Sequence, residues 1–476
     1  MSSVKKNYIF NLLLTVFNIL FPIISFPYVA KVLGAVGIGK VQFILSFSQY
    51  FALVAALGIP IYGARVISQA AHDKKLLYRT FSELIYIHII CSLIVSLLYI
   101  ITIFSFSFFD QDRSLYLMAG LIILMGFTSI DWYFSGIENF RLIAIRSVAV
   151  KLVSLFSLYL FVQTEGDYNI YLFISIVAIL GNNIINVISV RKYIKFSSKG
   201  IRRHFKPLTF TFGTTLASSM YTILDTVLIG ILSDEKSVGL YSASIRLTKI
   251  SIPVIISSAT VLIPMISKLF KVGDFVSLRP LLDKSFNFIV MLGTPMCIGL
   301  LFLAPELIFV FSSSQFSEAA FTMQILSPLT LIIGLGYFWA FQILIPSGKD
   351  KQLLISITIG MITNLIMNFI LIPVYKQNGA AVANVVSELI ITLCYMFFCY
   401  RTIPFRISHK PILLNLLATF PFIAISFYTR SLNLNVYVFL TINILLAIAI
   451  YFVIQATVLN RRLLKDLMGD LTNRKQ

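Results

Sequence analysis

Charged residues are scarce in this chain of 476 residues, since Asp, Glu, Lys and Arg together make up only 12% of it. A soluble protein carries about a quarter charged residues. Hydrophobic residues make up 58% of the chain, and the mean hydropathy is +0.92. No soluble core hides that much apolar surface. The composition therefore excludes a soluble globular protein and predicts an all-α polytopic membrane protein.

Cysteine is also scarce, and the motifs of several enzyme classes are absent. The four cysteines (Cys91, Cys297, Cys394 and Cys399) all lie in apolar stretches, without a CxxC pair or a Cys/His cluster. This arrangement disfavours disulfides and structural zinc, and we interpret the cysteines as packing residues. The sequence has no GxxxxGK[ST] phosphate-binding loop, which argues against ATP hydrolysis by this chain. We expect no cofactor and no metal.

Acidic residues are few beside basic ones: 19 Asp and Glu against 38 Lys and Arg give a net charge of +19. Most of the basic residues fall on alternate connections between the apolar stretches. Membrane helices are oriented by this asymmetry, with Lys and Arg left in the cytoplasm. We therefore interpret the charge as a signal of topology, with both termini cytoplasmic, and expect no nucleic-acid partner. The first apolar run, 8–30, is too long for a cleavable signal peptide.

Hydropathy predicts about fourteen transmembrane helices, each near the 20 residues that cross a bilayer. Two six-helix lobes are expected, with two further helices at the C-terminus. The predicted domains are an N-terminal lobe at 1–195, a basic cytoplasmic linker at 196–207, a C-terminal lobe at 208–402, and the last two helices with a basic tail at 403–476. The predicted spans are 8–30, 38–61, 81–104, 115–136, 143–163, 168–190, 208–232, 243–267, 285–311, 320–345, 353–374, 379–400, 411–429 and 435–457.

The first and seventh spans share polar residues spaced alternately by four and three positions, which places them along one helical face. Because both stripes recur at the same place in an internal repeat, we predict that they line a lumen between two halves. Close packing of helices through small and hydroxyl residues is the alternative. Gly39 corresponds to Gly239 in the loops that follow. The stripes are Asn11, Thr15, Asn18, Pro22 and Ser25, and Thr211, Thr215, Ser218, Thr222 and Asp225.

Four segments, in this order and spacing, resemble the Wzx-type oligosaccharide flippases, of the superfamily that also holds the multidrug and toxic-compound exporters (MATE). The resemblance covers helices 1 to 12 and so most of the chain. The segments are LGAVGIGKVQFILSFSQYFALVAALGIPIYGAR at 33–65, DWYFSGIENF at 131–140, LDTVLIGILSDEKSVGLYSASIRL at 224–247 and NLIMNFILIPVYKQNGAAVANVVSE at 364–388.

The resemblance implies a MATE-like fold whose two lobes open alternately to either side, without ATP hydrolysis. It implies a flippase of the bacterial inner membrane that moves undecaprenyl-diphosphate-linked oligosaccharide to the outer leaflet, for O-antigen, capsule or exopolysaccharide synthesis. Membrane lipids, a polysaccharide polymerase and a chain-length regulator are the further partners it implies.

Ionisable residues at bilayer depth cost about 2.5–3.5 kcal/mol each, so they usually face an interior or a water-filled cavity. Arg65 ends the second span, where a guanidinium suits a diphosphate or snorkels to lipid headgroups. Arg246 and Lys249 share one face of the eighth span, at a depth similar to Asp225. These three form either a structural ion pair or a gate.

Further candidates carry amides or basic charge. Asn364 and Asn368 lie four residues apart and either hydrogen-bond sugar hydroxyls or join helices. Lys31 and Lys151 add positive charge at the two mouths of the path or snorkel. We group Arg65, Arg246, Lys249, Asn364, Asn368 and Lys31 as the predicted substrate-binding residues.

Glu388, near the middle of the twelfth span, is a candidate for proton coupling, and a hydrogen bond to a neighbouring helix is the alternative. Glu83 and His88 in the third span are further coupling candidates, although a lone membrane histidine is more often a packed residue. Asp131 and Glu138 bracket the DWYFSGIENF segment, where we interpret them as fixing the turn and the packing of the lobe.

Two rival functions follow from the same sequence. An exporter of organic cations favours an acidic cavity, whereas the candidates here are mainly cationic and match an anionic substrate better. A membrane-embedded polymerase, ligase or glycosyltransferase needs a sizeable loop or domain, and every predicted outer loop has about 10 residues or fewer. We therefore expect a transporter and not an enzyme.

Overall fold

Every regular element in the described part of the computed structural model is a helix, as expected for a chain that satisfies its backbone polar groups within the bilayer. The structure describes residues 3–190, 200–219 and 223–459. Nine helices there are long and apolar enough to span a membrane, or up to eleven when each of two bent pairs counts as one span. The all-α polytopic fold is thus confirmed. The predicted count of spans stays a prediction, because 208–232 includes residues outside those described.

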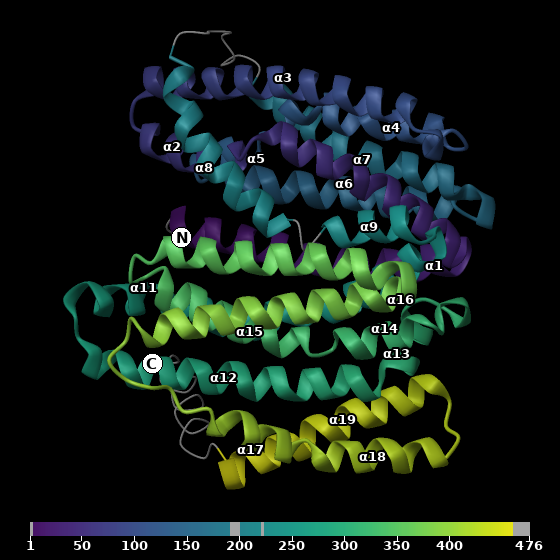
Figure 1. Cartoon of the computed structure of the whole chain (residues 1–476), viewed down its shortest axis with the longest axis vertical. Helices are drawn as coiled ribbons and strands as arrows, with labels where there is room; N and C mark the ends of the chain where they lie inside the picture. The colour runs from purple at the N-terminus through teal and green to yellow at the C-terminus, as the bar shows by residue number, and fades with distance from the viewer. Residues whose placement is uncertain (1–2, 191–199, 220–222, 460–476) are drawn as a thin grey trace. The chain divides into compact units, whose positions relative to one another are not determined.

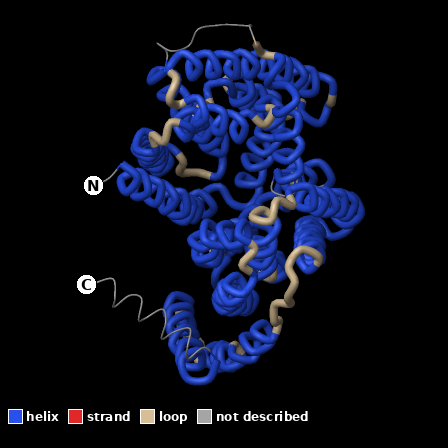
Figure 2. Tube along the Cα trace, turned by 90° about the vertical axis from the view of Figure 1, so that its left-hand side faces the viewer, coloured by secondary structure: helices blue, strands red, loops and turns tan. Residues whose placement is uncertain are grey.

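Two compact units make up the chain, Met1–Gly239 and Leu240–Gln476. Figure 1 shows their helices coloured along the chain, and Figure 2 shows the helical trace from a second side. The first unit contains α1 (Ser3–Ala56), α2 (Ile59–Ala70), α3 (Lys74–Ser105), η1 (Ser107–Phe109), α4 (Arg113–Leu124), η2 (Gly126–Thr128), α5 (Asp131–Gly136), α6 (Phe140–Phe161), η3 (Glu165–Asp167), α7 (Tyr168–Val190), α8 (Arg202–Ser219), α9 (Asp225–Leu232) and the start of α10 (Glu235–Ile250).

The second unit continues from α10 and carries the C-terminal helices. It contains α11 (Ile252–Val272), α12 (Phe275–Phe302), α13 (Ala304–Phe311), η6 (Ser314–Phe316), α14 (Ala319–Leu326), α15 (Leu329–Trp339), η7 (Ala340–Leu344), α16 (Asp350–Tyr400), α17 (Lys410–Ala418), α18 (Phe420–Ser431), α19 (Val436–Ile454) and η8 (Gln455–Leu459).

The division between the units lies beyond the basic linker. Helices α8 and α9 begin the second sequence repeat, yet α8 packs against α2 and α9 packs against α1. The first unit therefore includes the first helices of the second repeat. The division of the chain into two lobes at the linker 196–207 stays a prediction.

Two helices double back on themselves and each holds two of the predicted spans. The backbone leaves helical geometry at Gly34 in α1 (φ 66°, ψ −176°) and at Lys376 in α16 (φ 50°, ψ −130°). Figure 1 shows α1 and α16 each turning back on itself. The sequence predicted loops at both places.

Several predicted spans are broken where hydropathy indicated one helix. The predicted span 115–136 consists of α4 and α5, bent by 41° around η2. The predicted span 285–311 covers parts of α12 and α13, and 320–345 covers α14, α15 and η7. The segment Ala319–Leu344 still passes as one candidate span. An average of hydropathy over about 20 residues locates a span but does not detect a local break within it.

Helix α3 shows how the bilayer inverts the usual pattern of burial. Between Ile90 and Phe104 its exposed residues are apolar, whereas its buried face carries hydroxyl, carboxyl and imidazole groups. This is the arrangement of a helix that meets lipid on one face and keeps its polar groups against protein. The exposed set includes Leu93, Ile94, Leu97, Leu98 and Ile101, and the buried polar set includes Ser82, Glu83, His88, Ser92 and Ser96.

The core of the first unit lies where α2, α3 and α5 meet. Trp132 and Tyr133 of α5 pack on Phe81 of α3, with ring centroids 5.6 and 4.5 Å apart. Helix α2 approaches closely through Gly63, because a Cβ atom there would lie only 2.5 Å from the Trp132 ring. The absence of a side chain at Gly63 therefore allows α2 to pack closely against α5.

We expect Gly63→Ala to lower the stability of the protein by about 1–3 kcal/mol, because the added methyl group displaces the Trp132 ring. The measurement is the thermal unfolding midpoint of purified protein in nanodiscs. The matched control is Gly181→Ala in α7, where no described heavy atom beyond the adjacent residues and the nearby helix backbone lies within 4 Å of the added Cβ. An equal fall in the midpoint for both variants would contradict this account.

Candidate functional site

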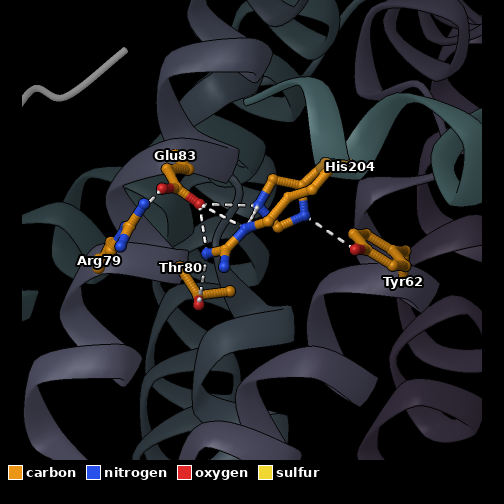
Figure 3. A network of polar contacts seen from close by, with 6 residues as sticks. Tyr62, Arg79, Thr80, Glu83 and His204 are labelled. Atoms are coloured by element: carbon orange, nitrogen blue, oxygen red, sulfur yellow. Dashed lines mark hydrogen bonds and ion pairs between the residues drawn. The ribbon is translucent and has the colours of Figure 1, made fainter. Parts of the chain in front are cut away.

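A buried carboxylate, Glu83 of α3, is the centre of a polar cluster in the first unit (Figure 3). Its Oε1 accepts a hydrogen bond from Arg79 Nε at 2.9 Å. Its Oε2 accepts hydrogen bonds from Arg203 Nη2 at 2.6 Å and Nε at 3.1 Å, and lies 2.9 Å from Nε2 of His204. Both oxygens of an otherwise costly buried charge are thus satisfied by cationic or polar donors.

His204 of α8 extends the cluster to α2. Its Nδ1 lies 2.8 Å from the hydroxyl of Tyr62. Burial lowers the pKa of His204, so the ring is neutral near pH 7. A neutral ring with its proton on Nε2 donates to Glu83 and accepts from Tyr62, and this tautomer satisfies both partners. We call Tyr62, Arg79, Thr80, Glu83, Arg203 and His204 the Glu83 cluster.

The chain before α8 is shaped to reach this cluster. Gly200 has φ +98°, a backbone conformation that residues other than glycine rarely adopt. A Cβ at Gly200 would also lie 2.6 Å from Oε1 of Glu83 and 3.0 Å from Nη2 of Arg79. Glycine at this position therefore lets the chain pass the carboxylate and lead Arg203 and His204 onto it. The cluster fastens the start of α8 to α2 and α3.

A second polar network joins α5, α6 and α7 around the buried Arg146, although the Asp131 side chain is half exposed. Arg146 Nη2 donates to Asp131 Oδ1 at 2.6 Å, and its Nε donates to Asn182 Oδ1 at 3.1 Å. Asn186 Nδ2 donates to the same Asp131 oxygen at 2.8 Å. The side chain of Arg146 is 4% exposed. The bend at α5 is thereby held to two neighbouring helices through one carboxylate.

A third contact joins the two sequence repeats at the predicted outer end of the first unit. A Cβ at Gly39 of α1 would lie 1.7 Å from the Glu235 carbonyl oxygen and 2.8 Å from the Gly239 nitrogen of α10. The two glycines that correspond in the repeat therefore meet through their backbones. Beside them, Lys40 Nζ lies 2.7 Å from Asp112 Oδ2 and 3.9 Å from Glu235 Oε1.

In the second unit, the two asparagines of α16 are buried and bond to each other. Asn368 Nδ2 donates to Asn364 Oδ1 at 3.0 Å, and both residues are at most 1% exposed. Asn384 Nδ2 donates to the Tyr241 hydroxyl at 3.2 Å. Glu388 is buried one turn further along α16.

An apolar cavity of about 690 Å³ lies beside α12 in the second unit. Its walls come from α12, α13, α18 and α19, and include Leu292, Pro295, Leu300, Phe422, Ile448 and Phe452. Its polar end carries Tyr451 and Gln455, which both bond to Asn415 Oδ1 at 2.5 Å. The last two predicted spans thus supply one wall of a lipophilic cavity.

The remaining predicted residues lie on several helices. Arg65 is exposed on α2, with its guanidinium 5.8 Å from the centre of the Tyr62 ring, next to the Glu83 cluster. Lys31 is exposed on α1. Arg246 and Lys249 are half-buried on α10, and Asp225 is buried at the start of α9.

His88 and Glu138 have different surroundings from the other candidates. His88 is buried in α3, and neither ring nitrogen has a hydrogen-bond partner among the described residues. Glu138 is exposed, with φ 56°, in the turn between α5 and α6.

The polar stripes are engaged mainly with their own helices. Ser25 donates to the Phe21 carbonyl, Thr211 to that of Pro207 and Thr215 to that of Thr211. Asn18 accepts a hydrogen bond from Lys151 of α6, and Thr15 is exposed. The side chains of Asn11 and Ser218, and all of Thr222, lie outside the described residues. Whether the stripes line a lumen stays a prediction.

Sequence reasoning missed most members of the Glu83 cluster and of the network around Asp131. Arg146, Arg203 and His204 lie in segments that the charge pattern assigned to the cytoplasm, so they were interpreted as orienting or linker residues. One available signal was the pair Asn182 and Asn186, four residues apart in an otherwise apolar helix. Among the described residues, no three His, Cys, Asp or Glu side chains gather to hold a metal ion.

A family model and individual curated proteins both match this chain. A family model described as polysaccharide biosynthesis protein matches residues 4–270. A protein described as an O-antigen transporter of Escherichia coli (strain K12) is 23% identical over 83% of this chain and 96% of its own length. The capsular polysaccharide biosynthesis protein CapF of Staphylococcus aureus is 26% identical over 66% of this chain and 82% of its own.

Two solved structures share the fold. The lipid II flippase MurJ in an inward closed conformation has a TM-score of 0.78 and 18% identity, covering 94% of this chain and 98% of its own. An inward-facing multidrug resistance MATE transporter has a TM-score of 0.64 and 14% identity, covering 82% of this chain and 94% of its own. The predicted MATE-like architecture is thus confirmed.

We expect Glu83→Gln to loosen the start of α8, because the amide keeps the shape of the carboxylate but loses its charge-assisted bonds to two guanidinium groups. Hydrogen exchange of the first α8 amides should accelerate, and stability should fall by about 2 kcal/mol. Glu165→Gln in the exposed η3 turn is the control and should change neither. Unchanged exchange in α8 would show that the cluster does not hold this helix.

Proposed function

This chain belongs to the polysaccharide biosynthesis protein family, and we propose that it is a flippase that moves undecaprenyl-diphosphate-linked oligosaccharide from the cytoplasmic to the outer leaflet. The observation that carries the proposal is the match to the O-antigen transporter over 96% of that protein's length. The fold shared with a lipid II flippase over 94% of this chain supports it. The protein acts as a transporter and not as an enzyme.

An anionic substrate suits the basic candidates. Arg65 is exposed on α2 and rests beside the Tyr62 ring, which fixes its guanidinium near the predicted cytoplasmic end of the helix. A guanidinium binds a phosphate through two parallel hydrogen bonds. Arg246, Lys249 and Lys31 add positive charge along the predicted path. These residues bind the diphosphate in our proposal, while Asn364 and Asn368 serve the sugar or the packing of α16.

The lipid part of the substrate requires an apolar surface inside the protein or at its edge. The cavity of about 690 Å³ in the second unit has almost entirely apolar walls and a single polar end. A stretch of polyprenyl chain fits such walls, because burial of each CH₂ group contributes about 0.8 kcal/mol. In our proposal α17, α18 and α19 therefore help to hold the lipid tail of the substrate.

Alternating access is the proposed mechanism. The contact of Gly39 with Glu235 and Gly239 joins helices of the two sequence repeats at the predicted outer end. In our proposal this contact is closed while the inward side is open and separates when the outer side opens. Asp225, Glu388, Glu83 and His88 are the candidates for coupling or gating. The two proposed lobes are 1–195 and 208–402.

The setting of the protein follows from the same proposal. It lies in the bacterial inner membrane with both termini in the cytoplasm, as the basic connections indicate. A polysaccharide polymerase and a chain-length regulator act on the product in the outer leaflet. Export of organic cations, which the shared fold with a MATE transporter suggests, is the second candidate function.

Deletion of the gene should abolish the surface glycan and leave lipid-linked repeat units accessible only from the cytoplasmic side. The measurements are glycan staining and protection of the lipid-linked sugar from an added glycosidase in sealed spheroplasts. Unchanged glycan together with a raised susceptibility to cationic drugs would instead support export of organic cations.

In the deletion strain, a plasmid that carries Arg65→Ala should restore at most about a tenth of the translocation that the wild-type gene restores. The reason is that a charge-assisted hydrogen bond contributes about 1.5–3 kcal/mol. Arg65→Lys should be intermediate, because it keeps the charge and loses the paired geometry. Arg202→Ala, at an exposed arginine of α8, is the matched control and should retain full activity. Normal activity of Arg65→Ala at equal expression would remove Arg65 from the site.

Gly39→Val should prevent closure of the outer contact, because the added atoms overlap the Glu235 carbonyl. Translocation should fall at least about tenfold, as expected when one of two alternating states is lost. Ser237→Cys, in a background in which the four native cysteines are replaced by alanine, should label faster with a membrane-impermeant maleimide when Gly39→Val is also present. Gly181→Val is the control; equal labelling in both would exclude the contact as a gate.

A further inference from the structure

A shallow cavity of about 560 Å³ lies in the first unit between the start of α6 and the end of α7. It is lined by Asn139, Arg141, Leu142, Ile145, Arg146 and Ile185. The charge pattern of the sequence places this end of both helices at the cytoplasmic face. None of its lining residues belongs to the predicted substrate-binding set.

The floor of this cavity carries an incompletely satisfied guanidinium. Arg146 is 5% exposed, and its Nη2 and Nε are bonded to Asp131 and Asn182. Its Nη1 is buried and has no hydrogen-bond partner among the described residues. A buried donor without a partner costs about 1–3 kcal/mol, more when it is charged, so this atom favours a ligand that carries an acceptor.

The rim adds positive potential. Arg141 is exposed, and no ion pair to it occurs within the described part of the chain. Asn139 caps α6, with its Oδ1 accepting from Leu142 N at 3.4 Å, so the positive end of a helix of 22 residues faces the same place. The donors at this end of α6 therefore converge on an anion.

The charge balance indicates what kind of anion fits. Asp131 neutralises Arg146, which leaves Arg141 as the uncompensated charge of the lining. One surplus positive charge matches a phosphodiester with a single negative charge better than a diphosphate. The walls below the rim are aliphatic, since Ile145 and Ile185 are 52% and 40% exposed. An acyl chain covers such a surface.

We propose that this cavity binds an anionic phospholipid of the cytoplasmic leaflet, with its phosphodiester on Arg141 and Arg146 and an acyl chain along Ile145 and Ile185. The bound lipid shields the bend held by Asp131 and Arg146 and ties α6 to α7. The inference is independent of the proposed function, because it requires no translocated substrate.

The test uses a tryptophan reporter in the full-length protein, Ile145→Trp, in detergent micelles with lipids brominated on the acyl chain. Brominated phosphatidylglycerol should quench the added fluorescence at an about fivefold lower mole fraction than brominated phosphatidylcholine. This factor corresponds to about 1 kcal/mol per basic residue near an anionic lipid. Protein without the reporter gives the background from Trp132 and Trp339.

Arg141→Gln in the reporter protein should abolish the preference for phosphatidylglycerol, whereas Arg202→Gln, an exposed arginine at the start of α8, should leave it intact. Equal quenching by the two lipids, or a preference that survives Arg141→Gln, would overturn the proposal. Displacement of phosphatidylglycerol by equimolar undecaprenyl diphosphate would assign the cavity to the substrate instead. Displacement by millimolar inorganic phosphate alone would show an anion site that needs no lipid.

Bound lipid is also measured directly, which keeps the test independent of the reporter. Native mass spectrometry of the wild type should retain phosphatidylglycerol after delipidation, and Arg141→Gln should retain several-fold less. Arg141→Gln and Arg202→Gln should each elute from size-exclusion chromatography as a single folded species, since Arg141 and Arg202 are exposed. Equal retention by the wild type and Arg141→Gln would contradict the proposal.

Discussion

The hydrocarbon core of a bilayer offers no hydrogen bonds, so each polar group within it must find its partner inside the protein. This constraint explains why every regular element of the described chain is helical. It also explains why α3 turns Leu and Ile outward and keeps Glu83, His88 and three of its serines inward. Charged residues in such a protein are few, and two of its carboxylates join helices. Glu83 connects three helices, and Asp131 connects three others.

The same constraint gives the helix breaks their significance. A span that ends or bends at bilayer depth exposes backbone groups that need partners. The bend between α4 and α5 lies beside the network of Asp131, Arg146, Asn182 and Asn186. Rigid helices joined at such bends are the elements that allow a transporter to change shape without unfolding.

The sequence alone predicted the membrane fold, the family and most spans, because hydropathy over about 20 residues measures the same quantity that a bilayer selects. The predicted span 168–190 coincides with α7 (Tyr168–Val190). It could not predict the pairing of His204 with Glu83, since the two residues are 121 positions apart and only the folded chain brings them together. Arg146 was missed for a different reason: a basic residue near a helix end resembles an orienting charge until its buried partners are known.

The place of α8 and α9 in the first unit has a consequence for how such a protein is assembled. The predicted second repeat begins with α8 and α9, whereas the packing of the described chain places both helices in the first unit. A chain cut at the basic linker would therefore leave α2 without α8, the helix that packs against it.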